Sequence, residues 1–214
     1  MDSLHRLEEL FAKFPGIGPR QARRFVYYLL NKSPSAVKEF TQLIEEVRGS
    51  TSECGQCHRF FIQTSNFQLP TSSFCPTCSD ASRDQETLMI VARDSDFETV
   101  EKSAAYKGLY FILGGTVPIL DKDPEKRIRL EKLLEHVTHS SSNSNAKSSF
   151  KEIILSLNTT PDGEHTATIV KEALQKVTKN SPVKISILGR GLSTGAELEY
   201  VDGETIKSAL QNRH

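Results

Sequence analysis

The chain contains four cysteines, and their spacing predicts a metal site. Cys54, Cys57, Cys75 and Cys78 form two C-x2-C pairs separated by seventeen residues. A two-residue gap lets both thiolates of a pair face one point, and two pairs complete the tetrahedral sulfur site that zinc takes in structural positions. All four thiolates are used, which leaves no open position for catalysis. We therefore predict a structural zinc ion in a C4 zinc finger over residues 53–79.

Two other interpretations use the same cysteines. Two disulfides would suit a secreted protein, and a redox C-x-x-C motif needs only one pair, beside a strand–helix–strand unit. The first nine residues, however, carry acids where a signal peptide needs an apolar core, and no apolar run approaches the roughly 18 residues of a membrane span. We therefore expect a cytoplasmic protein, in which structural zinc is favoured over disulfides.

Two helical patterns flank a glycine turn near the start of the chain. Apolar residues recur at three- and four-residue steps in residues 4–14 and again in residues 22–30. Pro19 suits the first position of the second helix, where its missing N–H is no loss. Gly16 and Gly18 let backbone N–H groups approach a phosphate oxygen at the start of that helix. The pattern predicts a helix-hairpin-helix.

The charge distribution agrees with a phosphate-binding role for this segment. Lysine plus arginine and aspartate plus glutamate number 27 each, so binding to nucleic acid has to come from a local patch. Between Glu9 and Glu39 the chain has six cations and no acid. Three of the cations are arginines in the first turn and a half of the second helix. Cations at a helix start interact unfavourably with the helix dipole, so contact with a phosphate would explain their position.

From this pattern we predict that residues 1–52 form a DNA-binding domain that contacts the sugar–phosphate backbone and does not read bases. The predicted contact residues are Gly16, Gly18, Arg20, Arg23 and Arg24. The alternative interpretation is a solvated face on an ordinary two-helix unit, since a Gly-x-Gly turn alone is common.

From residue 88 onward, short apolar runs alternate with amphipathic helical patterns. The expected strands cover residues 88–91, 110–113, 153–157 and 183–188. The expected helices cover residues 94–107, 124–137 and 166–177. This alternation predicts an α/β fold with a parallel sheet between helices. Residues 140–149, rich in serine and asparagine, are expected to form a flexible loop, and residues 197–201 alternate like an exposed strand.

The carboxyl ends of the strands are where such sheets concentrate function. The third expected strand is followed by a glycine-containing loop that holds Asp162 and Glu164. A two-metal site needs carboxylates directly at the strand ends, but those positions hold Ala92, Asn158 and Thr160. We therefore predict that the chain is not an enzyme and that its acids form a surface for a protein partner.

The ordered set of segments resembles the bacterial recombination mediator family RecR, over nearly the whole chain. The resemblance is carried by FPGIGPRQARR (14–24), the cysteine pairs, the strand–helix–strand segment 88–115, EIILSLNTTPDGEHTATIV (152–170) and GRGLSTGAELEYVDGETIKSAL (189–210). Any one of these pieces occurs widely, but the ordered set is specific.

The resemblance implies a domain order and a function. The helix-hairpin-helix (1–52) and the C4 zinc finger (53–79) are followed by a Toprim-like α/β domain (80–180) and a C-terminal, Walker-B-like segment of strand and helix (181–214) that takes part in assembly. RecR proteins form dimers and often a tetrameric ring wide enough for duplex DNA. With RecO and RecF they help load RecA onto gapped DNA coated by single-strand-binding protein, and the family is non-enzymatic.

The resemblance also assigns site residues by their positions in this sequence. Arg20 and Arg24 fall where the family has basic DNA-contacting positions. Asp96, Asp162 and Glu164 fall where it has acids at the strand ends, implicated in holding RecO.

This chain departs from the family pattern in three places. Ala92 stands where Toprim domains have a glutamate, which argues against a metal or acid role there. The gap between the cysteine pairs is longer than usual, which predicts an extra hairpin over residues 58–74. Residues 122–124 replace the usual Gly-x-Gly turn.

The sequence thus predicts a non-enzymatic, DNA-binding mediator of recombinational repair that is cytoplasmic and associated with the nucleoid. One alternative is a magnesium-dependent Toprim nuclease or primase-like enzyme. The other is a zinc-ribbon adaptor that binds proteins and never touches DNA.

Overall fold

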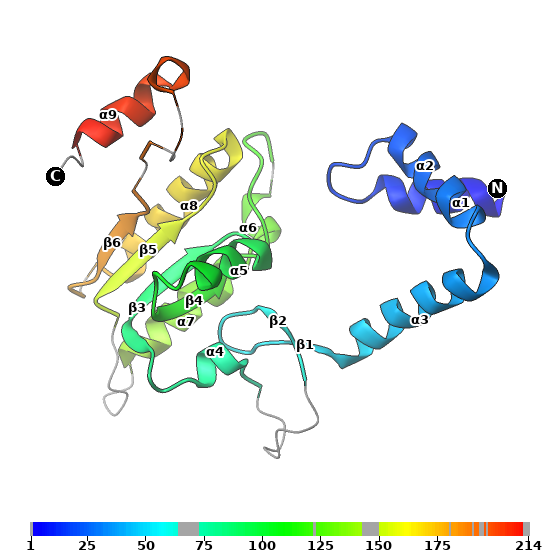
Figure 1. Cartoon of the computed structure of the whole chain (residues 1–214). Helices are drawn as coiled ribbons and strands as arrows, with labels where there is room; N and C mark the ends of the chain where they lie inside the picture. The colour runs from blue at the N-terminus through cyan, green and yellow to red at the C-terminus, as the bar shows by residue number, and fades with distance from the viewer. Residues whose placement is uncertain are drawn as a thin grey trace. The chain divides into compact units, whose positions relative to one another are not determined.

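The computed structural model describes residues 2–63, 73–121, 123–142, 150–179, 181–189, 191–192, 195 and 197–211. The chain divides into two compact units (Figure 1), one formed by residues 1–52 and 62–67 and the other by residues 53–61 and 68–214. Among the residues described, no helix combines the length and the apolar character needed to cross a bilayer.

The described residues of the first unit form three helices, and polar residues or prolines start each of them. They are α1 (Ser3–Ala12), α2 (Pro19–Leu30) and α3 (Pro34–Ser50). The Asp2 carboxylate accepts the N–H of Leu4, and the Ser33 hydroxyl accepts the N–H of Ala36. Pro19 occupies the first turn of α2, as predicted. The predicted helix-hairpin-helix is confirmed.

The second unit is built on a four-stranded parallel sheet in the order β4-β3-β5-β6. The strands are β3 (Asp84–Val91), β4 (Gly108–Ile112), β5 (Glu152–Ser156) and β6 (Lys184–Ile187). The helices that follow β3 are α5 (Asp94–Ser103), α6 (Pro124–Arg127), α7 (Leu130–Ser142), α8 (Pro161–Val177) and α9 (Gly203–Gln211). The predicted α/β fold with a parallel sheet flanked by helices is confirmed.

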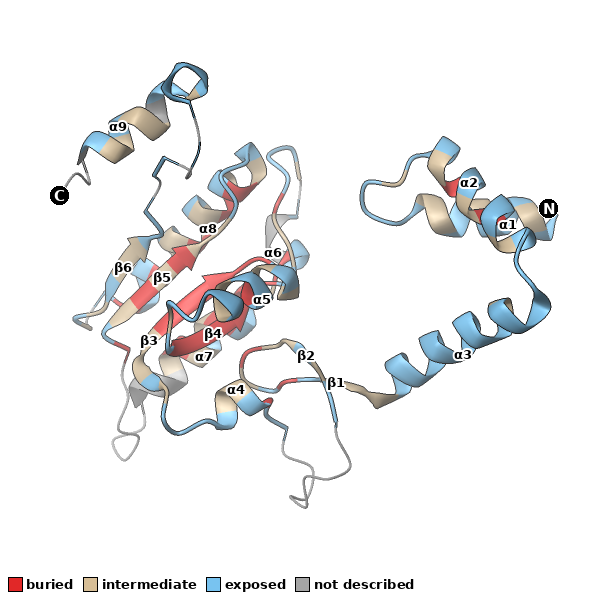
Figure 2. Ribbon diagram, viewed as in Figure 1, coloured by how far each residue is buried: buried red, intermediate tan, exposed pale blue. Residues whose placement is uncertain are grey.

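Alternate side chains of the buried strands face two separate cores. Leu88, Ile90 and Phe111 belong to a large core that includes side chains of α7 and α8, whereas Met89 and Tyr110 face a smaller core with α5. Figure 2 shows the buried residues concentrated in β3, β4 and β5. The acids and backbone groups at the carboxyl edge of the sheet are therefore held on a rigid base.

Two short strands and one helical turn carry the cysteine segment. The strands are β1 (Thr51–Glu53) and β2 (Phe60–Ile62), which pair in a two-stranded sheet, and the turn is α4 (Pro76–Ser79). Of the expected extra hairpin over residues 58–74, residues 64–72 lie outside the described residues.

The start of α8 corrects the prediction that Asp162 and Glu164 lie in a loop. The helix begins at Pro161, five residues before the predicted start, and the Thr160 hydroxyl accepts the N–H of Gly163. Both acids therefore stand in the first turn, where the helix dipole favours negative charge. Gly163 is required there, because a Cβ atom at this position would overlap the carbonyl oxygen of Asn158.

The helix predicted for residues 124–137 is interrupted, and that predicted for 94–107 is shorter. Ile128 is extended between α6 and α7, and the N–H of Arg129 donates to the Leu113 carbonyl at 2.8 Å, so this backbone pairs with the end of β4. Ala104 ends α5 in the left-handed conformation, with φ of 54°.

The exposed strand predicted for residues 197–201 is also wrong. Leu198–Tyr200 form a 3-10 turn, closed by the N–H of Tyr200 donating to the Glu197 carbonyl at 3.1 Å. Of the expected loop over residues 140–149, residues 140–142 are the last residues of α7 and residues 143–149 lie outside the described part of the chain.

Candidate metal and nucleic-acid sites

The two C-x2-C pairs come together in one cluster, as their spacing predicts. One sulfur ligand atom from each of Cys54, Cys57, Cys75 and Cys78 lies within 4.8 Å of the others, and the Cys57 and Cys75 sulfurs are 3.6 Å apart. The first three cysteines are almost completely buried, and none of the four is in a disulfide. The disulfide interpretation is therefore wrong for the structure described.

This geometry fits a tetrahedral metal ion. Four sulfurs at about 2.3 Å from a central zinc are about 3.8 Å apart, close to the separation in the cluster. Cys54, Cys57 and Cys75 are buried and Cys78 is partly buried, so the four sulfurs are largely shielded from solvent. Thiolate is the form that binds a metal, so the cluster is suited to metal binding.

The cysteine segment is docked on the carboxyl edge of the sheet by its backbone. The N–H of Ile112, the last residue of β4, donates to the Cys57 carbonyl at 2.9 Å. The N–H of Phe60 donates to the carboxylate of Asp94, also at 2.9 Å. The Arg59 guanidinium lies over the Phe97 ring, 4.2 Å from its centroid. The metal cluster and the start of α5 are therefore one structural assembly.

We expect Asp94→Ala to loosen this docking and lower the free energy of unfolding by about 1.5–3 kcal/mol, because a charge-assisted hydrogen bond to Phe60 is lost. Hydrogen exchange at the Phe60 amide should accelerate. Asp94→Asn is the matched control, since its carbonyl oxygen can still accept the bond. Unchanged stability and Phe60 protection in Asp94→Ala would contradict the docking role.

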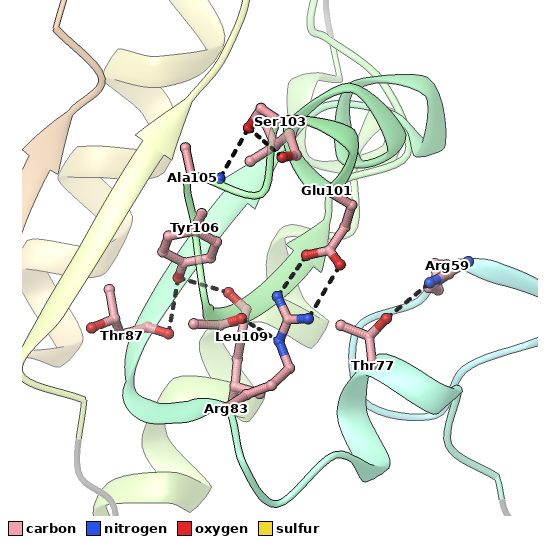
Figure 3. A network of polar contacts seen from close by, with 11 residues as sticks. Arg59, Thr77, Arg83, Thr87, Glu101, Ser103, Ala105, Tyr106 and Leu109 are labelled. Carbon is pink, nitrogen blue, oxygen red and sulfur yellow. Dashed lines mark hydrogen bonds and ion pairs between the residues drawn. The ribbon is translucent and has the colours of Figure 1, made fainter.

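A second polar network fixes the chain that follows the last cysteine (Figure 3). Arg83 binds the Glu101 carboxylate with both terminal nitrogens, at 2.6 and 3.2 Å, and its Nε donates to the Gly108 carbonyl at 3.0 Å. The Tyr106 hydroxyl lies 3.0 Å from the Thr87 carbonyl oxygen, and burial raises the pKa of that hydroxyl. Because these contacts join α5 to β3 and β4, they are structural.

The glycine turn between α1 and α2 leaves backbone donors open at the start of α2. Gly16 has a φ of 74°, which favours glycine, and a Cβ at Gly16 or Gly18 would meet nothing within 4 Å. The carbonyl of Gly18 already accepts the N–H groups of Gln21 and Ala22 at 3.0 Å. Within the part of the chain that is described, the N–H groups of Gly18 and Arg20 donate to no acceptor. An oxyanion can approach this turn.

The three predicted arginines lie on the exposed side of α2, but they are not equivalent. Arg23 donates to the Glu8 carboxylate of α1 at 3.1 Å, so it is partly neutralised. Arg24 donates to the neutral side chain of Gln21, at 3.3 Å, and pairs with no acid among the residues described. Arg20 makes no ion pair or hydrogen bond with the described residues. The expectation of uncompensated charge thus fits Arg20 and Arg24 and is wrong for Arg23.

The three predicted partner-binding acids stand at helix starts on the carboxyl side of the sheet. Asp96 accepts the N–H of Arg93 at 3.0 Å and so caps α5. Asp162 accepts the N–H of Ile119 at 3.3 Å, and Glu164 is exposed in the first turn of α8. Among the described residues, the four cysteines are the one group of three or more His, Cys, Asp or Glu side chains close enough to hold a metal ion. The three acids form no second group of this type.

Two features of the sites escaped the sequence prediction. The docking role of Asp94 depends on a contact between residues 34 positions apart, and no local pattern encodes it. The second missed feature is helix α3. The sequence does indicate this helix, because Ser33-Pro34 is typical of a helix start and Val37, Phe40 and Ile44 have helical spacing. These three side chains face the same side of α3.

Comparison with known proteins gives consistent matches along the chain. The profile of the RecR helix-hairpin-helix matches residues 4–48, that of the Toprim domain residues 86–189, and that of the RecR C-terminal region residues 191–214. The recombination protein RecR of Chloroflexus aggregans is 33% identical over 208 residues, which cover 97% of this chain and 91% of that protein. The recombination protein RecR of Legionella pneumophila is 32% identical over 213 residues, which cover 100% of this chain and 96% of that protein.

Proposed function

This chain belongs to the RecR family of recombination proteins, and from that premise we propose that it is a non-enzymatic mediator that binds DNA through its phosphate backbone. In this proposal it acts in the cytoplasm, at the nucleoid, in recombinational repair. Together with RecO and RecF it helps load RecA on gapped DNA.

The observation that carries the DNA-binding role is the start of α2. Unused backbone donors at Gly18 and Arg20 adjoin the exposed guanidinium of Arg20, with Arg24 one turn further along the same side. Glycine turn, helix dipole and cations all attract a phosphate oxygen, and none of them distinguishes one base from another. We therefore propose sequence-independent binding through Gly16, Gly18, Arg20, Arg23 and Arg24, with Arg20 and Arg24 as the main contacts.

A non-enzymatic role is supported by the residues at the carboxyl edge of the sheet. Ala92 follows β3, and Asn158 lies two residues beyond β5. Two of the nearby carboxylates, Asp94 and Asp96, accept backbone N–H groups and so hold the structure together. We propose that Asp96, Asp162 and Glu164 form the surface that meets RecO. Acidic side chains gathered at helix starts suit a basic partner.

We propose that the metal in the four-cysteine cluster is zinc and that its role is structural. Four thiolates with no open position are typical of structural zinc, and the cluster has few apolar contacts of its own, chiefly with Phe61. In this scheme residues 53–79 form a zinc finger between the DNA-binding domain (1–52) and the Toprim domain (80–180). Residues 181–214 take part in assembly.

Assembly of several copies is supported by an apolar stripe on α3. Phe40, Leu43, Ile44 and Val47 are each about half exposed, although apolar residues at this spacing normally pack against another element. We propose that such surfaces join protomers into dimers and a tetrameric ring, which multiplies weak phosphate contacts.

We expect Phe40→Glu to reduce the molar mass measured by light scattering to that of a smaller assembly, because a buried charge opposes association. Gln42→Glu places the same charge on a polar position of α3 and should leave the mass unchanged. If Phe40→Glu keeps the mass of the unmodified protein, the α3 stripe is not part of an interface.

The proposed function is tested by fluorescence anisotropy of the full chain with labelled gapped duplexes of two unrelated sequences. We expect equal affinity for both at low salt and steep weakening as salt rises. Magnesium added to the same samples should give no cleavage or synthesis. No binding at low salt would favour the protein adaptor, and magnesium-dependent turnover would favour the enzyme.

A further inference from the structure

Tyr27 lies on the cationic side of α2, one turn beyond its last arginine. It follows Arg20 by seven residues, Arg23 by four and Arg24 by three, and these spacings place all four side chains on one side of a helix. The side that α2 buries carries Ala22 and Val26 instead. Tyr27 is thus an aromatic side chain that shares one side of α2 with three arginines.

Tyr27 is covered by its own unit only in part. Its side chain is 51% exposed, and within the described part of the chain its hydroxyl makes no hydrogen bond. It also takes no part in an apolar groove of about 800 Å³ in the same unit, which is lined by residues that include Phe11, Tyr28 and Phe40. The neighbouring Tyr28 contrasts with it, because Tyr28 lines that groove and lies under the Lys32 ammonium.

We propose that Tyr27 stacks on an unpaired base and so directs the chain to single-stranded DNA, as found within a gap. The inference rests on the proposed DNA-binding function and adds a substrate class to it. Aromatic rings beside cations are how proteins bind single strands without reading sequence, because every base has a π-face and the cations hold the backbone. Duplex DNA offers no such face except at its ends.

The dimensions of α2 suit this arrangement. The helix rises 1.5 Å per residue, so Tyr27 lies about 10 Å along the axis from Arg20. A stacked strand rises about 3.4 Å along its axis for each nucleotide, so the site spans about three nucleotides. Phosphates bind at Arg20 and Arg24, and one base turns toward Tyr27.

The test measures binding of the full chain to three labelled probes, which are a single strand, the same strand with abasic sugars, and a blunt duplex. We expect Tyr27→Ala to weaken binding to the normal strand about 5- to 100-fold, the usual range for loss of one stacked base. Binding to the abasic strand and to the duplex should change less than about twofold. Tyr27→Phe, which keeps the ring, is the matched control and should bind like the unmodified protein.

Each other outcome has a definite meaning. If the unmodified protein binds normal and abasic strands equally, or if Tyr27→Ala weakens all three probes alike, the stacking inference is wrong while the proposed function stands. If the unmodified protein binds no probe at low salt, the proposed function itself fails. If Tyr27→Ala lowers the molar mass in light scattering, this side of α2 contacts a second copy and the inference is overturned.

Discussion

The double variant Arg20→Glu, Arg24→Glu is expected to lose at least about 100-fold in DNA affinity at moderate salt. Losing two phosphate contacts at about 1.4 kcal/mol each already gives this factor, and the introduced carboxylates add repulsion. Both arginines are exposed and neither has an acidic partner among the described residues, so the fold should be unchanged. The measurement is anisotropy with a gapped duplex, with circular dichroism to check folding.

Two comparisons make this result specific to α2. Lys102→Glu with Lys107→Glu changes net charge by the same amount on exposed residues of the Toprim unit, and it should leave affinity within about threefold. Arg23→Glu alone should have a smaller effect than Arg20→Glu, because Arg23 is already paired with Glu8. Affinity unchanged by the Arg20 and Arg24 substitutions would mean that DNA binds elsewhere.

Removal of the metal, or Cys57→Ser, is expected to unfold the cysteine segment and leave the sheet intact. Structural zinc contributes about 10 kcal/mol or more to segments of this kind, and among the described residues Phe61 is the one partly buried apolar side chain, besides Cys78, that packs against the cluster. The sheet keeps its own two cores, which contain none of the cysteines. Mass-spectrometric hydrogen exchange should show lost protection in residues 54–62 and 73–79, with Leu88–Val91 still protected.

Ser79→Ala is a matched control for Cys57→Ser, because Ser79 is next to Cys78 in the chain but is not one of the four candidate metal ligands. A thiol-competing chelator should release about one zinc ion per chain from the unmodified protein and from this control, but not from Cys57→Ser. Full protection of the cysteine segment after chelation would show that the metal does not hold it.

Local patterns predicted most of the fold. The C-x2-C spacing brings the cysteines together because each pair needs only a tight turn, and the cluster of Cys54 and its three partners confirms it. The apolar runs at residues 88–91 and 153–157 became β3 and β5 because their side chains pack into the cores on the two faces of the sheet. Pro19 after the glycine turn marked the start of α2.

The errors arose where tertiary contacts or helix caps override periodicity. Thr160 caps α8 and Pro161 is its first residue, a combination typical of a helix start. This helix start was missed because the apolar stripe of α8 begins only later in the helix. Ile128 leaves the helical conformation because the backbone of the next residue, Arg129, pairs with Leu113. Arg23 pairs with Glu8, fifteen residues earlier in the chain. The charges were counted only between Glu9 and Glu39, so the count left out Glu8 by one position.

The salt dependence of DNA binding tests the central claim most directly, because each phosphate contact contributes about 0.9 to the slope of log affinity against log salt. The slope is measured for the unmodified chain and for Arg20→Gln, Arg24→Gln, which removes the charges without adding repulsion. We predict that the variant's slope is smaller by about 2 for each protomer that touches DNA. Equal slopes would show that these two side chains do not contact phosphate and would contradict the account.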